Sequence, residues 1–192
     1  MNFSKLDLKV DPLPLQRALK INSHLFGEFD MRAQGDSPHR EMTDIWVRFN
    51  DIRPYLQKGS MEGFTDKHLS VWYPAYYELP ETKKLIFDVM EAVEGEQLGG
   101  VLITKLPPGG KIYPHSDDGW HAAYYNKYYI PIENYEGATF NFEDGTIKPK
   151  LGEVYQFDNT QKHWCMNESI GDRIAMVVCV RHEGQPRYGE TK

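Results

Sequence analysis

The residues best suited to chemistry lie in the segment Pro107–Trp120, which reads PPGGKIYPHSDDGW. Within it, His115 and Asp117 are two positions apart in a stretch that we predict to be extended, so both side chains leave the same face of one strand. An imidazole and a carboxylate placed side by side form half of a metal site. A chain with 7 His can contain such a pair by chance, and His39 and Glu41 form a second one.

The surroundings of the two pairs differ. No third ligand and no anion-binding residue follows His39 and Glu41 at short range, so we interpret them as a hydrogen-bonded pair where a loop meets a strand. His115 and Asp117 are followed by His163, far enough along the chain for intervening strands to return it across the mouth of a barrel. Two imidazoles and one carboxylate, with the other positions open, form the ligand set of non-haem Fe(II) oxygenases.

Arg173 begins the apolar strand RIAMVVCVRH and lies on one face of it with Ala175, Val177 and Cys179. An arginine that points inward among apolar neighbours needs an anionic partner. A bidentate carboxylate is the natural one, and a bound dicarboxylic cosubstrate would supply it. The alternative is an ion pair inside the protein, with one of three acidic residues, Asp158, Asp172 or Glu153.

The elements that must position these residues are mostly strands. From Gln97 onward, turn residues separate short β-rich runs, a spacing typical of an antiparallel sandwich or barrel. The predicted strands are Leu98–Leu106, Lys111–His115, Tyr124–Ile132, Ala138–Glu143, Thr146–Pro149, Glu153–Phe157 and Arg173–His182. Before them we predict amphipathic helices over Pro12–Phe26 and Glu81–Val93 and a strand over Asp44–Phe49. Val71–Tyr77 is either an edge strand or a wall of the pocket, because Pro74 interrupts it.

The sequence therefore predicts a mainly β fold with flanking helices. At 192 residues the chain is long enough for one well-buried core, and no linker-like tract divides it. We predict one domain over residues 1–192. Residues 1–96 would supply N-terminal helices and supporting strands, and residues 97–192 would form a double-stranded β-helix core, the jelly roll of cupin-like proteins.

Composition narrows the class of protein. Cys165 and Cys179 are too few for a disulfide framework, and buried free thiols indicate a reducing compartment. No apolar run is long enough for a signal peptide or a membrane span, so we expect a cytoplasmic protein with no membrane partner. The net charge of -6 argues against broad attraction to nucleic acid. Four arginines crowd one segment: Arg32, Arg40, Arg48 and Arg53. For most of them we expect solvated charge around a strand, and the alternative is that one or two face the pocket and hold a substrate carboxylate.

Three features occur in order between His115 and Arg173: the HSD motif, a strand ending in YYIPIEN, and the run GEVYQFDNTQKHWCMNESIGDR. An HxD, an FDN before a distal histidine, an asparagine and then an arginine are together far more specific than any one motif. This half of the chain resembles the Fe(II)- and 2-oxoglutarate-dependent dioxygenases of the aspartyl/asparaginyl β-hydroxylase type. The segment SPHREMTDIWVRF also resembles the region that precedes the core in these enzymes.

The resemblance implies a double-stranded β-helix in which His115, Asp117 and His163 bind Fe(II) and Arg173 grips the distal carboxylate of 2-oxoglutarate. Reaction with O2 would give succinate and CO2 and would hydroxylate an unactivated C–H bond. Family members that act on aspartyl residues in protein domains often lack the carboxylate ligand. The presence of Asp117 makes this chain similar to the small proline hydroxylases instead.

Two further positions differ from the family pattern. In the strand before IPI, the family frequently places an arginine and a histidine near the cosubstrate, and Lys127 and Tyr129 stand there in this chain. An ammonium and a phenol can still contact carboxylate oxygens, with a less fixed geometry than a guanidinium. We therefore expect Lys127 and Tyr129 to be cosubstrate contacts.

Three functions compete. The first is hydroxylation of an amino acid or of a protein or peptide side chain resembling Asp, Asn or Pro, with a small molecule or a peptide as substrate. The second is a cupin that uses another divalent metal for isomerisation or hydrolysis, which would need the metal ligands but not Arg173 as an anion clamp. The third is a non-catalytic β-sandwich binding module. The position of Arg173 shortly after His163 favours the first over both others.

Overall fold

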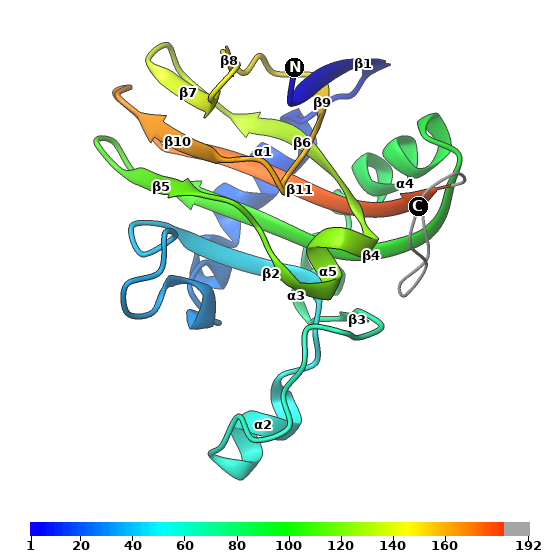
Figure 1. Ribbon diagram of the computed structural model, residues 1–192. Coiled ribbons are helices and arrows are strands. Elements are labelled where there is room, and N and C mark those ends of the chain that lie inside the picture. The colour runs from blue at the N-terminus through cyan, green and yellow to red at the C-terminus, as the bar shows by residue number, and fades with distance from the viewer. Residues whose placement is uncertain (183–192) are drawn as a thin grey trace.

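The computed structural model describes residues 1–182, and two antiparallel sheets make up its body (Figure 1). The larger, seven-stranded sheet has the order β1 (Phe3–Lys9), β9 (Glu153–Phe157), β6 (Asn126–Glu133), β11 (Arg173–His182), β4 (Gly95–Leu106), β2 (Thr43–Phe49) and β3 (Val71–Trp72). The four-stranded sheet has the order β5 (Lys111–His115), β10 (His163–Asn167), β7 (Ala138–Phe142) and β8 (Gly145–Ile147). The predicted mainly β, jelly-roll fold is confirmed.

The strand β11 lies in the middle of the larger sheet and shows why the two faces of that sheet differ. Side chains alternate along a strand, so Ile174, Met176 and Val178 point to one face and pack in the main hydrophobic core. Ala175 points to the other face, into a second core that also takes Phe140 from the smaller sheet. The space between the sheets is therefore lined from both sides, and Arg173 faces into it.

Two helices cover the outer face of the larger sheet, as the predicted amphipathic patterns require. The helix α1 (Leu13–Ile21) contacts β6 and buries Leu15 and Leu19, and α4 (Thr82–Ala92) contacts β4 and buries Leu85 and Val89. Figure 1 shows both helices behind the large sheet. The first helix is shorter than predicted, because a 3-10 turn, η1 (Ser23–Leu25), follows it.

Several elements were not predicted from the sequence. The strand β1 lies at the edge of the sheet. Its exposed residues occur at both odd-numbered and even-numbered positions, so it lacks the regular alternation of a half-buried strand. The strand β10 is short, and polar residues interrupt its apolar character. The segment predicted as an edge strand or a pocket wall splits at Pro74 into the edge strand β3 and a short helix, α3 (Ala75–Glu78). Short helical turns also occur at η2 (Met31–Ala33), α2 (Arg53–Lys58) and α5 (Gly119–Tyr124).

The segment around α2 projects away from the sheets, below β3 in Figure 1. Its base is held by the Asn50 side-chain amide, which donates to the Thr65 carbonyl at 2.7 Å, and by the buried Tyr73 hydroxyl, which donates to the Asn50 carbonyl at 2.5 Å. The segment returns Asp66 to the body, where it accepts a hydrogen bond from the backbone N–H of His121 in α5. Within residues 1–182, no helix is both long and apolar enough to cross a membrane.

Candidate metal centre and its cavity

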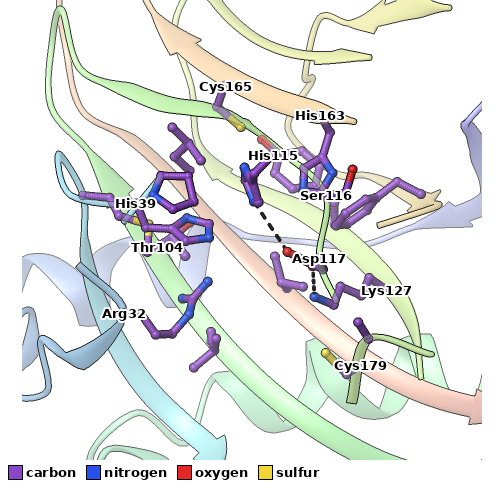
Figure 2. Close-up of a pocket in the computed structure, with 18 of the residues that line it drawn as sticks. Arg32, His39, Thr104, His115, Ser116, Asp117, Lys127, His163, Cys165 and Cys179 are labelled. Carbon is purple, nitrogen blue, oxygen red and sulfur yellow. Dashed lines mark hydrogen bonds and ion pairs between the residues drawn. The ribbon is translucent and has the colours of Figure 1, made fainter. Parts of the chain in front are cut away.

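A cavity of about 540 Å³ lies between the two sheets. Ile112 and Phe140 of the smaller sheet and Tyr129 and Phe157 of the larger sheet form its apolar walls. All six residues that the sequence predicts for the site line this one cavity: His115, Asp117, His163, Lys127, Tyr129 and Arg173. Figure 2 shows the polar side chains converging from strands that are far apart in the sequence.

His115 and His163 are brought together by strand pairing. They are register partners across β5 and β10, and their ring centres lie 4.4 Å apart. The Nδ1 of His115 lies 2.7 Å from the Tyr113 carbonyl, and the Nδ1 of His163 lies 2.8 Å from the Gln161 carbonyl. Because a carbonyl can only accept, each Nδ1 carries the proton and each Nε2 keeps a lone pair, as in metal-binding histidines.

Asp117 supplies the carboxylate of the group. Its Oδ1 lies 3.5 Å from the His115 Nε2, and its Oδ2 accepts hydrogen bonds from the Lys127 ammonium and, at 3.2 Å, from the Asn159 amide. Burial alone would raise the pKa of Asp117, but the Lys127 charge and the hydrogen bond from Lys127 outweigh it and hold that pKa well below its usual range. The carboxylate is therefore ionised and ready to bind a cation.

The donor set fits Fe(II). Burial lowers the pKa of His163, so its ring stays neutral at physiological pH. The His115 Nε2 is buried without a hydrogen-bond partner among residues 1–182. Two imidazole nitrogens beside an ionised carboxylate are the donors that a non-haem iron centre uses, and an orphaned buried nitrogen needs such a partner.

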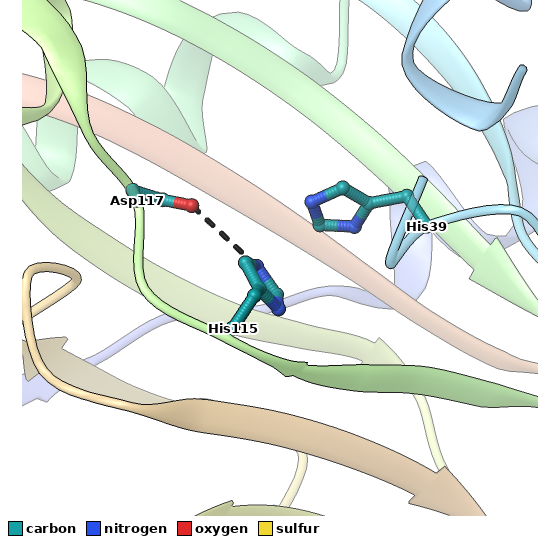
Figure 3. A group of neighbouring side chains, drawn as sticks. All are labelled: His39, His115 and Asp117. Carbon is teal, nitrogen blue, oxygen red and sulfur yellow. Dashed lines mark ion pairs between the residues drawn. The ribbon is translucent and has the colours of Figure 1, made fainter. Parts of the chain in front are cut away.

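The structure adds one residue, His39, which the sequence interpretation placed in a pair with Glu41. That interpretation is wrong, because the Glu41 carboxylate accepts instead from the Tyr113 hydroxyl and, at 2.8 Å, from the Lys111 N–H. Candidate ligand atoms of His39, His115 and Asp117 lie within 4.8 Å of one another (Figure 3). Desolvation and then the Arg32 charge lower the pKa of His39 to about 2, so its ring is neutral. The one signal for His39 in the sequence was its place in the segment SPHREMTDIWVRF, which resembles the region before the core in this type of dioxygenase.

Arg173 is 2% exposed, at the inner end of the cavity. Its guanidinium lies 5.2 Å from the centre of the Tyr129 ring, and its Nε has no hydrogen-bond partner in the described part of the chain. The alternative ion pair with Asp158, Asp172 or Glu153 is absent among residues 1–182. Glu153 accepts instead from Lys5, Lys9 and Tyr155.

Lys127 and Tyr129 lie at different places in the cavity. The Lys127 ammonium contacts Asp117, next to the candidate ligands. Tyr129 is buried beside Arg173, and burial raises the pKa of its phenol to about 12, so the hydroxyl stays protonated and can donate to an anion. Their contact with a cosubstrate stays a prediction for both residues.

One of the four clustered arginines lines the cavity. Arg32 does so while its Nη1 contacts the buried Asp44 carboxylate at 2.6 Å. The other three have partners of their own. The Arg40 guanidinium lies 3.6 Å above the Tyr113 ring. Arg48 donates to the Gly99 carbonyl, and Arg53 pairs with Asp51. Of the two interpretations of the cluster, the pocket-facing one applies to Arg32; its contact with a substrate stays a prediction.

The mouth of the cavity carries residues that the sequence did not assign. His121, from α5, lines it together with Asp66 and Asp118. The His121 ring stacks on His68 at 5.3 Å between ring centres. Burial, followed by the Lys127 and His68 charges, lowers the pKa of His121 to about 3. This part of the cavity therefore combines the neutral imidazole of His121 with two acidic residues, Asp66 and Asp118.

Comparison with solved structures supports the fold. A prolyl hydroxylase from Trichoplax adhaerens, in complex with a hypoxia inducible factor peptide, aligns with a TM-score of 0.62 and 11% identity over 100% of this chain and 88% of that one. A viral collagen prolyl hydroxylase from Paramecium bursaria Chlorella virus-1, in a 2-oxoglutarate complex, gives a TM-score of 0.52 and 14% identity over 94% and 96%. A prolyl-4-hydroxylase from Pseudomonas putida gives 0.51 and 10% over 95% and 94%.

Comparison by sequence identifies the family. No curated protein sequence matches this chain. A family model described as aspartyl/asparaginyl beta-hydroxylase matches residues 57–183 and therefore covers both candidate histidine ligands, the carboxylate and the buried arginine. The matched region is more than half of the chain and agrees with the resemblance seen in the motifs. The chain belongs to the aspartyl/asparaginyl β-hydroxylase family.

Proposed function

We propose that this protein is an Fe(II)- and 2-oxoglutarate-dependent dioxygenase that hydroxylates a C–H bond of an amino acid, either free or within a peptide. Membership of the aspartyl/asparaginyl β-hydroxylase family supports the reaction class. The observation that carries the proposal for this chain is Arg173, a buried cation without an acidic partner among residues 1–182, in the same cavity as His115, Asp117 and His163.

In this proposal His115 and His163 hold the metal through Nε2 and Asp117 holds it through a carboxylate oxygen. Bound Fe(II) supplies O2 activation, in which one oxygen atom enters the substrate C–H bond and the other enters succinate, as 2-oxoglutarate loses CO2. The carbonyls of Tyr113 and Gln161 fix the tautomers of the two histidines, so that both lone pairs face the metal.

Arg173 has the properties needed to bind the distal carboxylate of 2-oxoglutarate. Its planar guanidinium can donate two parallel hydrogen bonds, and in a buried site these charge-assisted bonds are strong. In this proposal Tyr129, which lies beside it and stays protonated, would donate a third. Lys127 binds Asp117 and so keeps the ligand ionised and oriented.

The substrate enters from the side of Asp66, Asp118 and His121. The solved prolyl hydroxylase from Trichoplax adhaerens holds a peptide, which supports a peptide as one of the two substrate classes. A small amino acid is the other, and the net charge of -6 disfavours nucleic acid. The two cysteines are buried free thiols, which supports a reducing compartment such as the cytoplasm.

Anaerobic titration of the metal-free protein with Fe(II) and 2-oxoglutarate tests the proposal. A visible charge-transfer band is expected for the wild type and for His121→Phe, which changes a cavity histidine outside the proposed ligand set, and the band should be lost in His115→Ala. Succinate release in the presence of O2 then provides the screen for substrates. Metal binding without the band, or a band that survives in His115→Ala, would contradict the assignment.

A further inference from the structure

His39 lies outside the three residues to which the proposed function assigns the iron, yet it reaches the same point in the cavity. Its candidate ligand atom lies within 4.8 Å of those of both His115 and Asp117. Figure 3 shows His39 on the opposite wall, with its ring directed at the gap between the other two. Two ligands on one metal at about 2.1 Å bond lengths are roughly 3 to 4 Å apart, so only a small closure would let all three share one ion.

The backbone holds His39 in register with the strand that carries His115. Tyr113 is the connecting residue, because its N–H donates to the Pro38 carbonyl at 2.8 Å while its own carbonyl accepts from the His115 Nδ1 at 2.7 Å. The backbone of Tyr113 in β5 therefore helps to position the imidazoles of both His39 and His115. Such a preorganised placement is what a ligand needs and is more than simple packing requires.

Side chains reinforce this connection. The Glu41 carboxylate accepts from the Tyr113 hydroxyl and from the Lys111 N–H at 2.8 Å. The Arg40 guanidinium lies 3.6 Å above the Tyr113 ring. His39 itself is fixed by its N–H, which donates to the Ser37 hydroxyl at 3.1 Å. The short segment 37–41 is thus attached to β5 on both sides of His39.

The His39 ring has a nitrogen available for a metal. Its Nδ1 is buried without a hydrogen-bond partner in residues 1–182, and an orphaned buried nitrogen requires an explanation. Packing is one, since the ring meets the His115 ring edge-on at 4.6 Å between centres and an angle of 78°. Packing does not, however, account for the approach of its ligand atom to the Asp117 carboxylate.

We propose that His39 is a fourth protein ligand of the resting iron centre and occupies one of the positions that His115, Asp117 and His163 leave open. This inference rests on the proposed function. Four protein ligands would leave a six-coordinate metal two positions, enough for a bidentate cosubstrate but not for O2 as well. His39 would therefore have to leave before O2 could bind beside the cosubstrate, so the enzyme with cosubstrate but without substrate would be unreactive towards O2.

The test counts imidazoles on the metal and does not depend on turnover. Each full-length variant is loaded anaerobically with Co(II), and its affinity is measured by competition with a chelator of known affinity. A Cu(II)-loaded sample gives the number of coordinated imidazoles by pulsed EPR. His39→Phe keeps a ring for packing but has no lone pair, and His121→Phe is the matched control in the same cavity.

We expect His39→Phe to bind Co(II) at least about 10-fold more weakly and to show one imidazole fewer, whereas His121→Phe should match the wild type in both measurements. His39→Ala should behave like His39→Phe, and added free imidazole should restore its affinity. Wild-type affinity and imidazole count in His39→Phe would overturn the proposal and assign His39 to packing. If wild-type protein forms no band with Fe(II) and 2-oxoglutarate, the proposed function itself fails.

Discussion

At the scale of single residues, Arg173 is held in an environment that would normally exclude an unpaired charge. It is 2% exposed, beside the Tyr129 ring, and none of residues 1–182 supplies an acidic partner within ion-pair distance. An isolated buried cation destabilises the native state, and a bound carboxylate reverses that cost. The stability of the protein should therefore report the occupancy of the cavity.

Arg173→Met provides a direct test of this coupling. Without 2-oxoglutarate the variant should be as stable as the wild type or more stable, because the substitution removes an unpaired buried charge and keeps an apolar side chain of comparable length. With Fe(II) present throughout, the addition of 2-oxoglutarate at a concentration that saturates the wild type should raise the melting temperature only for the wild type. The affinity for 2-oxoglutarate should fall at least about 100-fold, since two charge-assisted hydrogen bonds are lost.

The control for Arg173→Met is the Fe(II) affinity, which should not change, because the arginine does not belong to the candidate ligand group. Scanning calorimetry and the charge-transfer titration give both quantities on the same samples. A variant that is much less stable than the wild type without ligand would mean that Arg173 has a structural partner. An unchanged 2-oxoglutarate affinity would remove it from the site.

The neutral histidines predict a dependence of stability on pH. The pKa of His121 is lowered to about 3 by burial and by the Lys127 and His68 charges, whereas in the unfolded chain it is about 6.5. Below pH 6.5 the unfolded chain takes up a proton that the native protein does not, so the free energy of unfolding falls as the pH drops from 6.5 towards 3. This one group contributes up to about 1.4 kcal/mol per pH unit.

Urea unfolding of metal-free protein at pH 7, 6 and 5 measures this effect. His121→Gln should show a flatter loss of stability than the wild type, and the two curves should approach each other as the pH falls. Parallel curves would mean that His121 has the same pKa in the folded and unfolded chains and is open to water.

The site residues differ in whether they could be predicted from the sequence. His115 and Asp117 were predictable as a pair because they are two positions apart in a segment predicted to be extended. In the structure β5 ends at His115, and Asp117 lies just beyond its end. Arg173 was predictable because an arginine heads an apolar strand. His39 was not, because the contact that positions it joins Pro38 to Tyr113, and such pairing between a loop and a distant strand leaves no local pattern.

At the scale of elements, the short helix α5 follows β5, the strand that carries His115, and lies at the mouth of the cavity. It follows Asp118 and carries His121 into the cavity wall, and Asp66 from the projecting segment accepts from its backbone. Gly119 starts the helix with a φ of +84°, and a Cβ there would meet the Asp66 Oδ2 at 2.1 Å. The position therefore requires glycine for its conformation and for its space.

Gly119→Ala tests both requirements against a matched control. Gly109 has a similar φ of +78°, but nothing lies within 4 Å of its Cβ position. Gly109→Ala should cost about 1 kcal/mol of stability through backbone strain alone. Gly119→Ala should cost more, because the Asp66 carboxylate must also move. Urea unfolding measures both losses of stability, and equal losses would show that Asp66 can move away without cost.

Most of the strands and the two longest helices followed from periodicity, whereas elements such as α5 and β10 did not. The six residues of α5 are too few to show a helical period. The helix also lies directly before the strand predicted over Tyr124–Ile132, where the sequence indicates a connecting loop. The strand β10 becomes regular only by pairing with β5 and β7 on its two sides. Tertiary partners decide such elements, and a local pattern contains no information about them.

At the scale of the whole molecule, the larger sheet combines strands from both halves of the chain. The strands β1, β2 and β3 come before residue 96, and they flank the four strands contributed by β4, β6, β9 and β11. The predicted β-rich C-terminal half is therefore not complete by itself. Both sides of its main sheet are closed by the N-terminal half.

A fragment of residues 97–192 should accordingly fail to fold. Removal of the first half leaves β9 and β4 as unpaired edges and uncovers the apolar face that α1 and α4 bury. We expect the fragment to aggregate or to lack near-ultraviolet circular dichroism, while the full chain unfolds in one cooperative transition. A monomeric fragment with a cooperative melt would show that the two halves fold independently.

The pairing of β1 with β9 also has a consequence for how the protein is made. Phe3 pairs with Phe157, so β1 must wait for a strand that is synthesised much later. At about 5–20 residues per second, that wait lasts roughly 8 to 30 s. Throughout synthesis the nascent chain therefore exposes an unpaired strand and the apolar faces that it will later complete, and this interval is when the protein most needs a chaperone.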